Sequence, residues 1–154
     1  MHMMINVALG AVAVGVIGAL GMFAFSAMTP RPNNLGIKNG QLTPAPASPN
    51  CVSSTATDDV HKIQPFTFSG PAKDAVTKLK SIVRSMTGSN IVVEEERYLH
   101  AEFRSRIFRY VDDVEFLVHA DDQLIHFRSA SRVGHSDLGV NRARMEAIRE
   151  QFQE

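Results

Sequence analysis

The longest apolar segment of the chain covers residues 7–28, where Ser26 is the only conventional polar side chain. As an α-helix, these residues would extend about 33 Å, enough to cross a hydrocarbon core of about 30 Å. We therefore predict a transmembrane anchor within residues 1–28, surrounded by the lipid bilayer. A cleaved signal peptide is the alternative, since residues 24–26 (AFS) fit a cleavage site. The apolar segment is longer than usual for a signal peptide, however, and no Lys or Arg precedes it.

One face of this predicted helix carries only small side chains. Ala8, Ala11, Gly15 and Gly18 follow spacings of three, four and three residues, which places them on the same side of a helix. Small residues allow a second transmembrane helix to approach closely, so the pattern indicates a partner helix from another copy or from a membrane complex. The whole segment is rich in Ala and Gly, however, and such a composition also produces a small face by chance.

Charges beside the apolar segment give opposing indications of membrane orientation. Arg31 and Lys38 follow the segment, which by the positive-inside rule favours a cytoplasmic C-terminal part. The protonated N-terminal amine opposes that orientation, and anchors of this kind usually export the chain that follows. We therefore predict an extracytoplasmic C-terminal part.

Beyond the apolar segment, polar and apolar patterning divides the chain into a linker and one domain. Residues 29–59 are rich in Pro, Gly, Ser, Thr and Asn, a composition that buries too little apolar area to offset its ordering entropy. We predict a linker there, which either holds the domain away from the bilayer or lies across the domain surface. Residues 60–154 form the predicted globular domain, and their number suits a single domain.

The predicted domain contains two segments of helical periodicity. Apolar residues recur at helical spacing over residues 72–86, with Ser69 as the predicted N-cap and Gly88 as the stop. Residues 140–152 predict a closing helix. Its expected inner side consists of Val140, Ala143, Ala147, Ile148 and Phe152.

Strand patterns fill the interval between the two helices. Residues 90–103 combine β-branched and aromatic side chains and predict a strand. Residues 114–120 and 124–133 predict a hairpin that turns at residues 121–123, whereas residues 104–113 fit either a strand end or a single helical turn. The order of helix, strands and helix predicts an α+β fold, in which a small antiparallel sheet packs against two helices.

Charge and cysteine content narrow the classes of function. Lys plus Arg equals Asp plus Glu at 16 each, so the net charge is zero and no overall basic field attracts nucleic acid. No basic stripe with interleaved aromatic residues is present, and nucleic-acid binding is not predicted. Cys51 is the only cysteine, which excludes an intrachain disulfide.

Three stretches are familiar when they are taken together: PNCVSS at residues 49–54, YLHAEFRSRIFRYVDDVEF at 98–116 and RSASRVGHSDLGVNRARMEAIR at 128–149. Through them, residues 49–152 resemble the bacterial and plastid domain-of-unknown-function family 1499. The resemblance implies a secreted or membrane-anchored protein and no particular activity. It marks as motif positions Asn50, Cys51, Ser53, Ser54, His100, Glu102, Phe103, Asp112, Asp113, Glu115, Arg128, Ser129, Ser131, Arg132, Gly134, Asp137, Gly139, Asn141 and Arg142.

Several charged motif residues lie on neighbouring predicted elements. A guanidinium group can pair a carboxylate through two hydrogen bonds, so we predict a partly buried network that fixes strand register and docks the last helix. The alternative is an anion site in which the arginines converge and the acids orient them, although so many acids argue against it. The set comprises Asp112, Asp113, Glu115, Arg128, Arg132 and Arg142.

Four further residues are candidates for chemistry. His100 and Glu102 share one strand face and, with His126, could bind a divalent metal or act in acid–base catalysis. Their spacing matches no strong zinc signature, and we predict neither a metal nor a cofactor. Cys51 is the candidate nucleophile, but no cysteine-protease signature surrounds it, and a structural thiol is the favoured interpretation.

The segment RVGHSDLGVNRAR at residues 132–144 offers one more candidate site. Its glycines and the start of the following helix could present backbone N–H groups to an anion, although no phosphate-loop pattern is present. Capping of that helix by Ser136, Asp137 or Asn141 is the favoured interpretation.

These features favour a single-pass protein of the bacterial inner membrane, with a periplasmic domain that serves as a non-catalytic accessory or interaction subunit. The alternative is an extracytoplasmic ligand-binding or enzymatic domain that uses the arginines or His100 with Glu102. The two hypotheses differ in whether Cys51, His100, Glu102 and Arg132 line one open cavity.

Overall fold

The computed structural model describes residues 15, 18, 21, 26 and 28–154. Most of the predicted anchor, including Ala8 and Ala11 of its small-residue face, lies outside these residues. At Gly15 and Gly18, an added Cβ would meet no described atom within 4 Å. Across the described part of the chain, none of the helices combines the length and apolar character that a membrane crossing requires.

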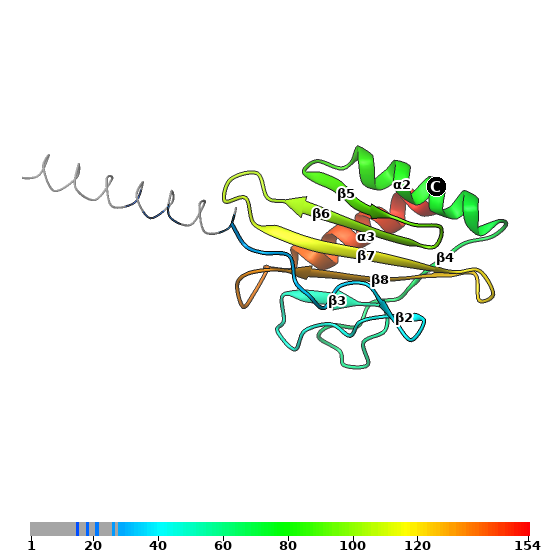
Figure 1. Ribbon diagram of the computed structural model, residues 1–154, viewed down its shortest axis with the longest axis horizontal. Coiled ribbons are helices and arrows are strands. Elements are labelled where there is room, and N and C mark those ends of the chain that lie inside the picture. Colours follow the sequence, from blue (N-terminus) through cyan, green and yellow to red (C-terminus); the bar gives the residue numbers. More distant parts are fainter. Residues whose placement is uncertain (1–14, 16–17, 19–20, 22–25, 27) are drawn as a thin grey trace, which may run out of the picture.

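An antiparallel sheet of six strands forms the centre of the fold (Figure 1). The strand order is β3-β8-β7-β6-β5, and β4 pairs with β8 as β3 does. The longest pairing joins β7 to β8 as the predicted hairpin, in which Phe116 lies opposite Phe127. The strands are β3 (Cys51–Ser53), β4 (Phe66–Thr67), β5 (Ser89–Glu94), β6 (Tyr98–Arg104), β7 (Val111–His119) and β8 (Leu124–Ser131).

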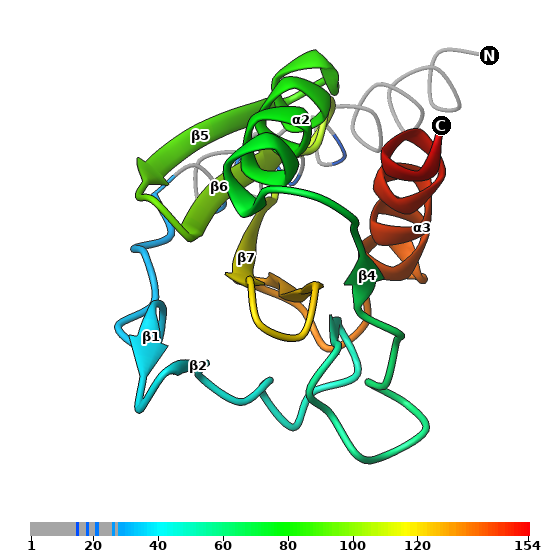
Figure 2. The same ribbon diagram turned by 90° about the vertical axis from the view of Figure 1, so that its right-hand side faces the viewer.

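Two helices, α2 (Ala72–Ser85) and α3 (Val140–Gln153), cover one face of this sheet (Figure 2). The core forms between them and the sheet, where Phe66, Phe116 and Phe127 are fully buried. The rings of Phe66 and Phe127 have centroids 4.6 Å apart. The predicted α+β fold, with an antiparallel sheet packed against two helices, is confirmed.

The region between the helices differs from its prediction in one respect. The single strand expected at residues 90–103 is two strands, β5 and β6, which turn where Glu95 N–H donates to the Tyr98 carbonyl at 2.8 Å. Residues 95–97 (EER), which connect the two strands, are all charged, and charged side chains are better solvated in a turn than in a sheet. Residues 105–110 form the loop between β6 and β7, closed by Ser105 N–H donating to the Tyr110 carbonyl at 2.9 Å.

The N-cap of α2 and part of the inner side of α3 differ from their predictions. Ser69 does not cap α2, whose N-cap is Pro71 without a side-chain hydrogen bond. In α3 the buried residues are Asn141, Met145, Ile148 and Phe152, while Val140 is 50% exposed and Ala143 is exposed. Helix α3 starts at Val140, as predicted, directly after Gly139.

Gly88 follows α2 at the predicted stop. Its φ is +81°, and an added Cβ would lie 2.5 Å from the Arg104 carbonyl oxygen. Both the left-handed backbone and the close approach of β6 therefore require glycine here.

The predicted linker, residues 29–59, packs against the sheet and is partly a strand of it. Its first part contains the hairpin of β1 (Ile37–Lys38) and β2 (Gln41–Leu42). Figure 2 shows this hairpin on the side of the sheet away from the helices. Residues 51–53 are β3, paired with β8. The folded unit therefore begins well before residue 60, and we call residues 29–50 the strap.

Candidate functional site

The sheet places ionisable side chains on the face that the strap covers. Alternation along β6 directs Leu99, Ala101 and Phe103 into the core with the helices. His100 and Glu102 therefore point to the opposite face. Register then sets their neighbours, because Glu102 pairs with Asp113, His100 with Glu115 and Glu115 with Arg128.

Asp113 lies on this face, is 2% exposed and interacts with two other ionisable side chains. Arg132 holds it with two hydrogen bonds of 2.7 Å, from Nε to Oδ2 and from Nη2 to Oδ1. His100 Nε2 lies 2.8 Å from Oδ1. Burial alone would raise the pKa of Asp113, but the hydrogen bonds from Arg132 and His100 outweigh it and lower the pKa. Asp113 is therefore a carboxylate at neutral pH.

Glu102 accepts hydrogen bonds from three arginines. Arg132 Nη2 donates to Oε1 at 2.6 Å, Arg31 Nη2 to Oε1 at 3.0 Å and Arg104 Nη2 to Oε2 at 2.9 Å. Burial raises the pKa of Glu102, but these guanidinium groups lower it by more. The pKa of Arg132 is raised mainly by its hydrogen bond to Asp113. Both partners therefore stay charged, and the buried charges are paired.

Glu115 and Arg128 form a third, fully enclosed pair. They make an ion pair through Glu115 Oε2 and Arg128 Nη2, and their side chains are 0% and 2% exposed. Tyr98 Oη donates to Glu115 Oε1 at 2.7 Å, and Gly36 N–H donates to the same oxygen at 2.5 Å. Burial and the Glu115 carboxylate raise the pKa of Tyr98, so the phenol stays protonated.

The strap completes this network with its backbone. Arg128 donates to the carbonyl oxygens of Asn34 at 3.0 Å, Thr43 at 3.2 Å and Pro44 at 3.1 Å. Leu42 of the strap packs against Tyr98 and Leu117 of the sheet. The buried guanidinium thus connects the strap to the sheet, and the network is closed from solvent only while the strap is in place.

A small cavity of about 260 Å³ remains between the strap and β8. Asp113, Arg128 and Arg132 line it, together with strap residues that include Asn34 and Asn50. Of Cys51, His100, Glu102 and Arg132, only Arg132 lines this cavity. The four candidates do not share it.

The arginines at this cavity are largely occupied. Arg132 uses Nε and Nη2 on carboxylates, and its Nη1 lies 3.4 Å from the Thr29 carbonyl oxygen. Arg128 donates to three carbonyls and pairs with Glu115. An anion in this cavity would therefore compete with two carboxylates that are already held in place.

Two members of the predicted charged set lie elsewhere. Asp112 points to the other face of β7 and accepts from Arg144 Nη2 of α3 at 2.5 Å. Arg144 also lies over the Phe103 ring, 4.7 Å from its centroid. Arg142 donates to the Val60 carbonyl at 3.0 Å. Arg144, not Arg142, therefore ties the last helix to the charged residues of the sheet.

His126 does not join His100 and Glu102. Its Nδ1 lies 3.2 Å from Ser54 Oγ, and burial lowers its pKa, with a smaller contribution from His119. Within the described residues, no three His, Cys, Asp or Glu side chains are grouped to hold a metal ion.

Cys51 is buried, and its thiol donates to the carbonyl oxygens of Pro46 at 3.3 Å and Ser48 at 3.2 Å. Burial raises the pKa of the Cys51 thiol to about 11. Nucleophilic chemistry needs a thiolate, so this environment opposes it. The neighbouring Asn50 side chain donates to the Gly134 carbonyl at 2.6 Å and ties this loop to the β8–α3 connection.

The start of α3 is occupied by Asp137. Its carboxylate accepts from Asn141 N–H at 2.7 Å and from Gly139 N–H at 3.1 Å. Burial raises the pKa of Asp137, but these backbone hydrogen bonds lower it by more. The helix N-terminus therefore already holds an internal carboxylate in the place where an external anion would bind.

Four residues of these networks were not among the sequence candidates. Tyr98 and Arg104 share the period-two face of His100 and Glu102, and that alternation could have identified both. Arg144 and Arg31 gave no comparable signal, because their partners lie about 32 and 71 residues away in the chain.

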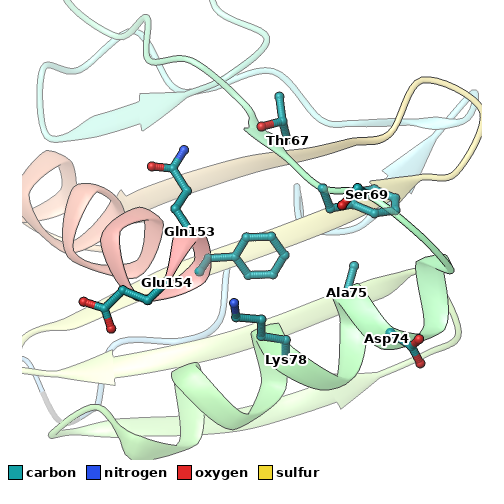
Figure 3. Close-up of a pocket in the computed structure, with 9 residues that line it drawn as sticks. Thr67, Ser69, Asp74, Ala75, Lys78, Gln153 and Glu154 are labelled. Carbon is teal, nitrogen blue, oxygen red and sulfur yellow. The ribbon is translucent and has the colours of Figure 1, made fainter.

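A second, more open hollow of about 480 Å³ lies between α2, β4 and the end of α3 (Figure 3). Lys78 directs its amino group toward the Phe152 ring, 5.5 Å from the centroid. Asp74 also lines the hollow, but its carboxylate points away from Lys78 (Figure 3). Its charged side chains do not converge on one point, unlike those of a typical ligand site.

Comparison with known proteins identifies one family. A family model described as protein of unknown function (DUF1499) matches residues 41–152. Neither the curated proteins nor the solved structures contain a match to the chain.

Proposed function

Because the chain belongs to the DUF1499 family, whose description assigns no activity, we propose that it is a membrane-anchored, non-catalytic accessory or interaction subunit. The observation that carries the proposal is the closed charge network. Arg132, Asp113 and Glu102 pair with one another beneath the strap, so the groups best suited to chemistry are used to hold the fold together.

The anchoring part of the proposal is supported by the sequence alone. Residues 7–28 are long and apolar enough to cross a bilayer. The small-residue face with Gly15 and Gly18 would let a second transmembrane helix pack against them. We place the protein in the bacterial inner membrane, crossing it once, with the folded unit in the periplasm.

Co-purification of the full-length protein from detergent-solubilised membranes tests this function. The G15L/G18L variant should lose a co-purifying membrane protein or self-association, because leucine side chains keep a partner helix away. The matched control I17L changes the same apolar segment away from the small-residue face, and it should retain the partner. A strictly monomeric wild-type protein without a membrane partner would contradict the proposal.

Alkaline washing of the membranes tests anchoring separately. An integral single-pass protein stays in the pellet, whereas a chain cleaved after residue 26 appears in the soluble fraction. Recovery of the wild-type chain in the wash would exclude the anchored arrangement.

The cavity beside Arg132 supports one second candidate, a site for a small anion. Arg132 Nη1 has the longest hydrogen bond of this guanidinium, 3.4 Å to the Thr29 carbonyl, and is the nitrogen most easily diverted to a ligand. This function predicts that inorganic phosphate or acetate raises the melting temperature of the wild-type protein and leaves R132Q unchanged. The accessory function predicts no shift for either protein, and a marked loss of stability in R132Q without ligand.

A further inference from the structure

Two loops lie at the end of the sheet where the chain continues toward the apolar segment (Figure 1). The first is the β6–β7 loop, residues 105–110, and the second is the β8–α3 loop, residues 132–139. The strands that carry them are paired at this end, since Arg132 N–H, at the start of the β8–α3 loop, donates to the carbonyl of Val111, the first residue of β7, at 3.0 Å. Arg132 Nη1 also lies 3.4 Å from the Thr29 carbonyl oxygen. One residue therefore links both loops to the point where the strap begins.

Exposed apolar side chains gather at this end. Among the described residues, seven large apolar side chains are exposed. Three of them lie on these loops, a fourth directly follows the β8–α3 loop, and a fifth directly precedes Thr29. Leu138 is 94% exposed, Ile107 74% and Phe108 41%. Met28, 81% exposed, ends the apolar segment, and Val140, 50% exposed, begins α3. Such a cluster indicates a contact surface rather than scattered surface hydrophobicity.

The charges of the β6–β7 loop favour one kind of surface. Arg106 and Arg109 flank Ile107 and Phe108, and residues 103–111 contain no Asp or Glu. Both arginines are exposed, and neither forms an ion pair with a described residue, unlike Arg104 at the strand end. Apolar tips flanked by unpaired arginines suit a bilayer surface with anionic headgroups.

The strap leaves no spacer between the apolar segment and the sheet. Only one residue after Met28, the Thr29 carbonyl approaches Arg132, and Arg31 is paired with Glu102. A folded unit held this closely to a membrane-inserted segment cannot move far from the membrane. Its loops at that end would therefore be presented to the lipid headgroups at high effective concentration.

We propose that the β6–β7 and β8–α3 loops insert their apolar tips into the bilayer surface beside the anchor and hold the sheet end-on to the membrane. The proposal rests on the anchoring proposed above. A protein partner covering the same tips is the competing occupant, and the unpaired arginines and the closeness of the apolar segment favour lipid.

A single tryptophan gives a direct test, because the chain contains none. The F108W variant of the full-length protein is reconstituted in vesicles of phosphatidylethanolamine and phosphatidylglycerol, with or without brominated lipid. We expect a blue-shifted emission that brominated lipid quenches. D121W is the matched control, since the β7–β8 turn lies at the opposite end of the sheet (Figure 1), and it should show neither effect.

L138W is the second reporter, should F108W disturb its loop. Unquenched emission from both reporters, in protein that resists an alkaline wash, overturns the loop contact and leaves the anchoring intact. Protein that the wash removes overturns the anchoring and the loop contact together. Reporters shielded from aqueous iodide but not quenched by brominated lipid would indicate a protein partner and also overturn the proposal.

Charge reversal provides an independent readout. In R106E/R109E/F108W, quenching by brominated lipid should decrease at least severalfold in the anionic vesicles, because each arginine near the surface favours binding to anionic lipid. The control K73E/F108W reverses a charge on helix α2 and should be quenched like F108W. Equal quenching in all three proteins would contradict a role for these arginines.

Discussion

The two faces of the sheet are stabilised in different ways. On the helix face, Phe66, Phe116 and Phe127 are fully buried among other apolar side chains, and the stabilisation is non-directional and grows with buried area. On the strap face, Glu115 and Arg128 are equally inaccessible, but each depends on particular partners. A side chain can move slightly on the first face at low cost, whereas on the second it leaves a buried charge unpaired.

This difference explains the role of the strap. Leu42 is the one buried hydrophobic residue of the strap, whereas the strap carbonyl groups accept from Arg128 and the Gly36 N–H donates to Glu115. A Pro- and Gly-rich segment can therefore be ordered by the polar groups it covers.

The largest expected loss of stability comes from truncating one buried side chain on either face. R128A leaves Glu115 buried without its ion-pair partner and should cost about 3–5 kcal/mol in the free energy of unfolding. F127A on the helix face should cost about the same, through its cavity. Denaturant unfolding measures both. Limited proteolysis should separate them, because only R128A releases the strap and exposes residues 29–50 to cleavage. An R128A protein with a protected strap would contradict the comparison.

Replacing the whole pair should be milder than breaking it. R128M/E115L leaves no unpaired buried charge and should recover about 2 kcal/mol relative to R128A. On the helix face, F116A/F127A should show no such recovery, since the second truncation only enlarges the cavity. The same unfolding experiment measures both double variants, and additive losses on the strap face would show that the ion pair is not the determining feature.

Acid should weaken the strap face selectively. The folded state lowers the pKa of Asp113 and of Glu102, whereas in the unfolded chain both carboxyls titrate near pH 4. This stabilisation is fully present at a pH above the pKa values of the unfolded chain, and it is lost as the pH falls through the lower pKa values of the folded state. The wild-type protein should therefore lose stability below about pH 4.5. The difference in free energy of unfolding between wild type and D113N should become smaller below that pH.

E94Q is the matched control for the acid experiment. Glu94 pairs with Lys80 and Arg84 on the surface, and its substitution should leave the pH dependence nearly unchanged because exposed pairs contribute little. A D113N protein that retains the full acid sensitivity of wild type would contradict the role of Asp113.

The smallest effect concerns Cys51, at the edge of the strap face. Because burial raises its pKa to about 11, the folded protein should react with a thiol reagent at pH 8 on the order of 100-fold more slowly than the unfolded chain. The control C51S/S69C places a thiol on the exposed segment before α2 and should react in the folded state. Rapid reaction of native Cys51 would show that the strap opens readily.

The helix face could be predicted from the sequence more completely than the strap face. The period of residues 72–86 identified α2, and the alternation in β7 and β8 identified their hairpin, because these patterns record burial against one apolar layer. The predicted membership of family 1499 is confirmed by the match over residues 41–152. For the strap face, the sequence identified only a set of charged residues, because a charged side chain in the sequence does not indicate which partner it will meet across the sheet.

Residues Asp112 and Asp113 illustrate this limit. They are neighbours in the sequence, yet one pairs with Arg144 among the helices and the other with Arg132 beneath the strap. Strand alternation alone predicts that they separate, but nothing local assigns the partner of each.

The sequence by itself determined the apolar segment, the helices, most strands and the family, because each depends on local periodicity or on a recognisable motif. Only the tertiary structure decided that the Pro-rich segment packs on the sheet, that Arg144 replaces Arg142 as the link to α3, and that His100 is buried against Asp113. These outcomes depend on strand register and on contacts between residues tens of positions apart, which no local pattern encodes.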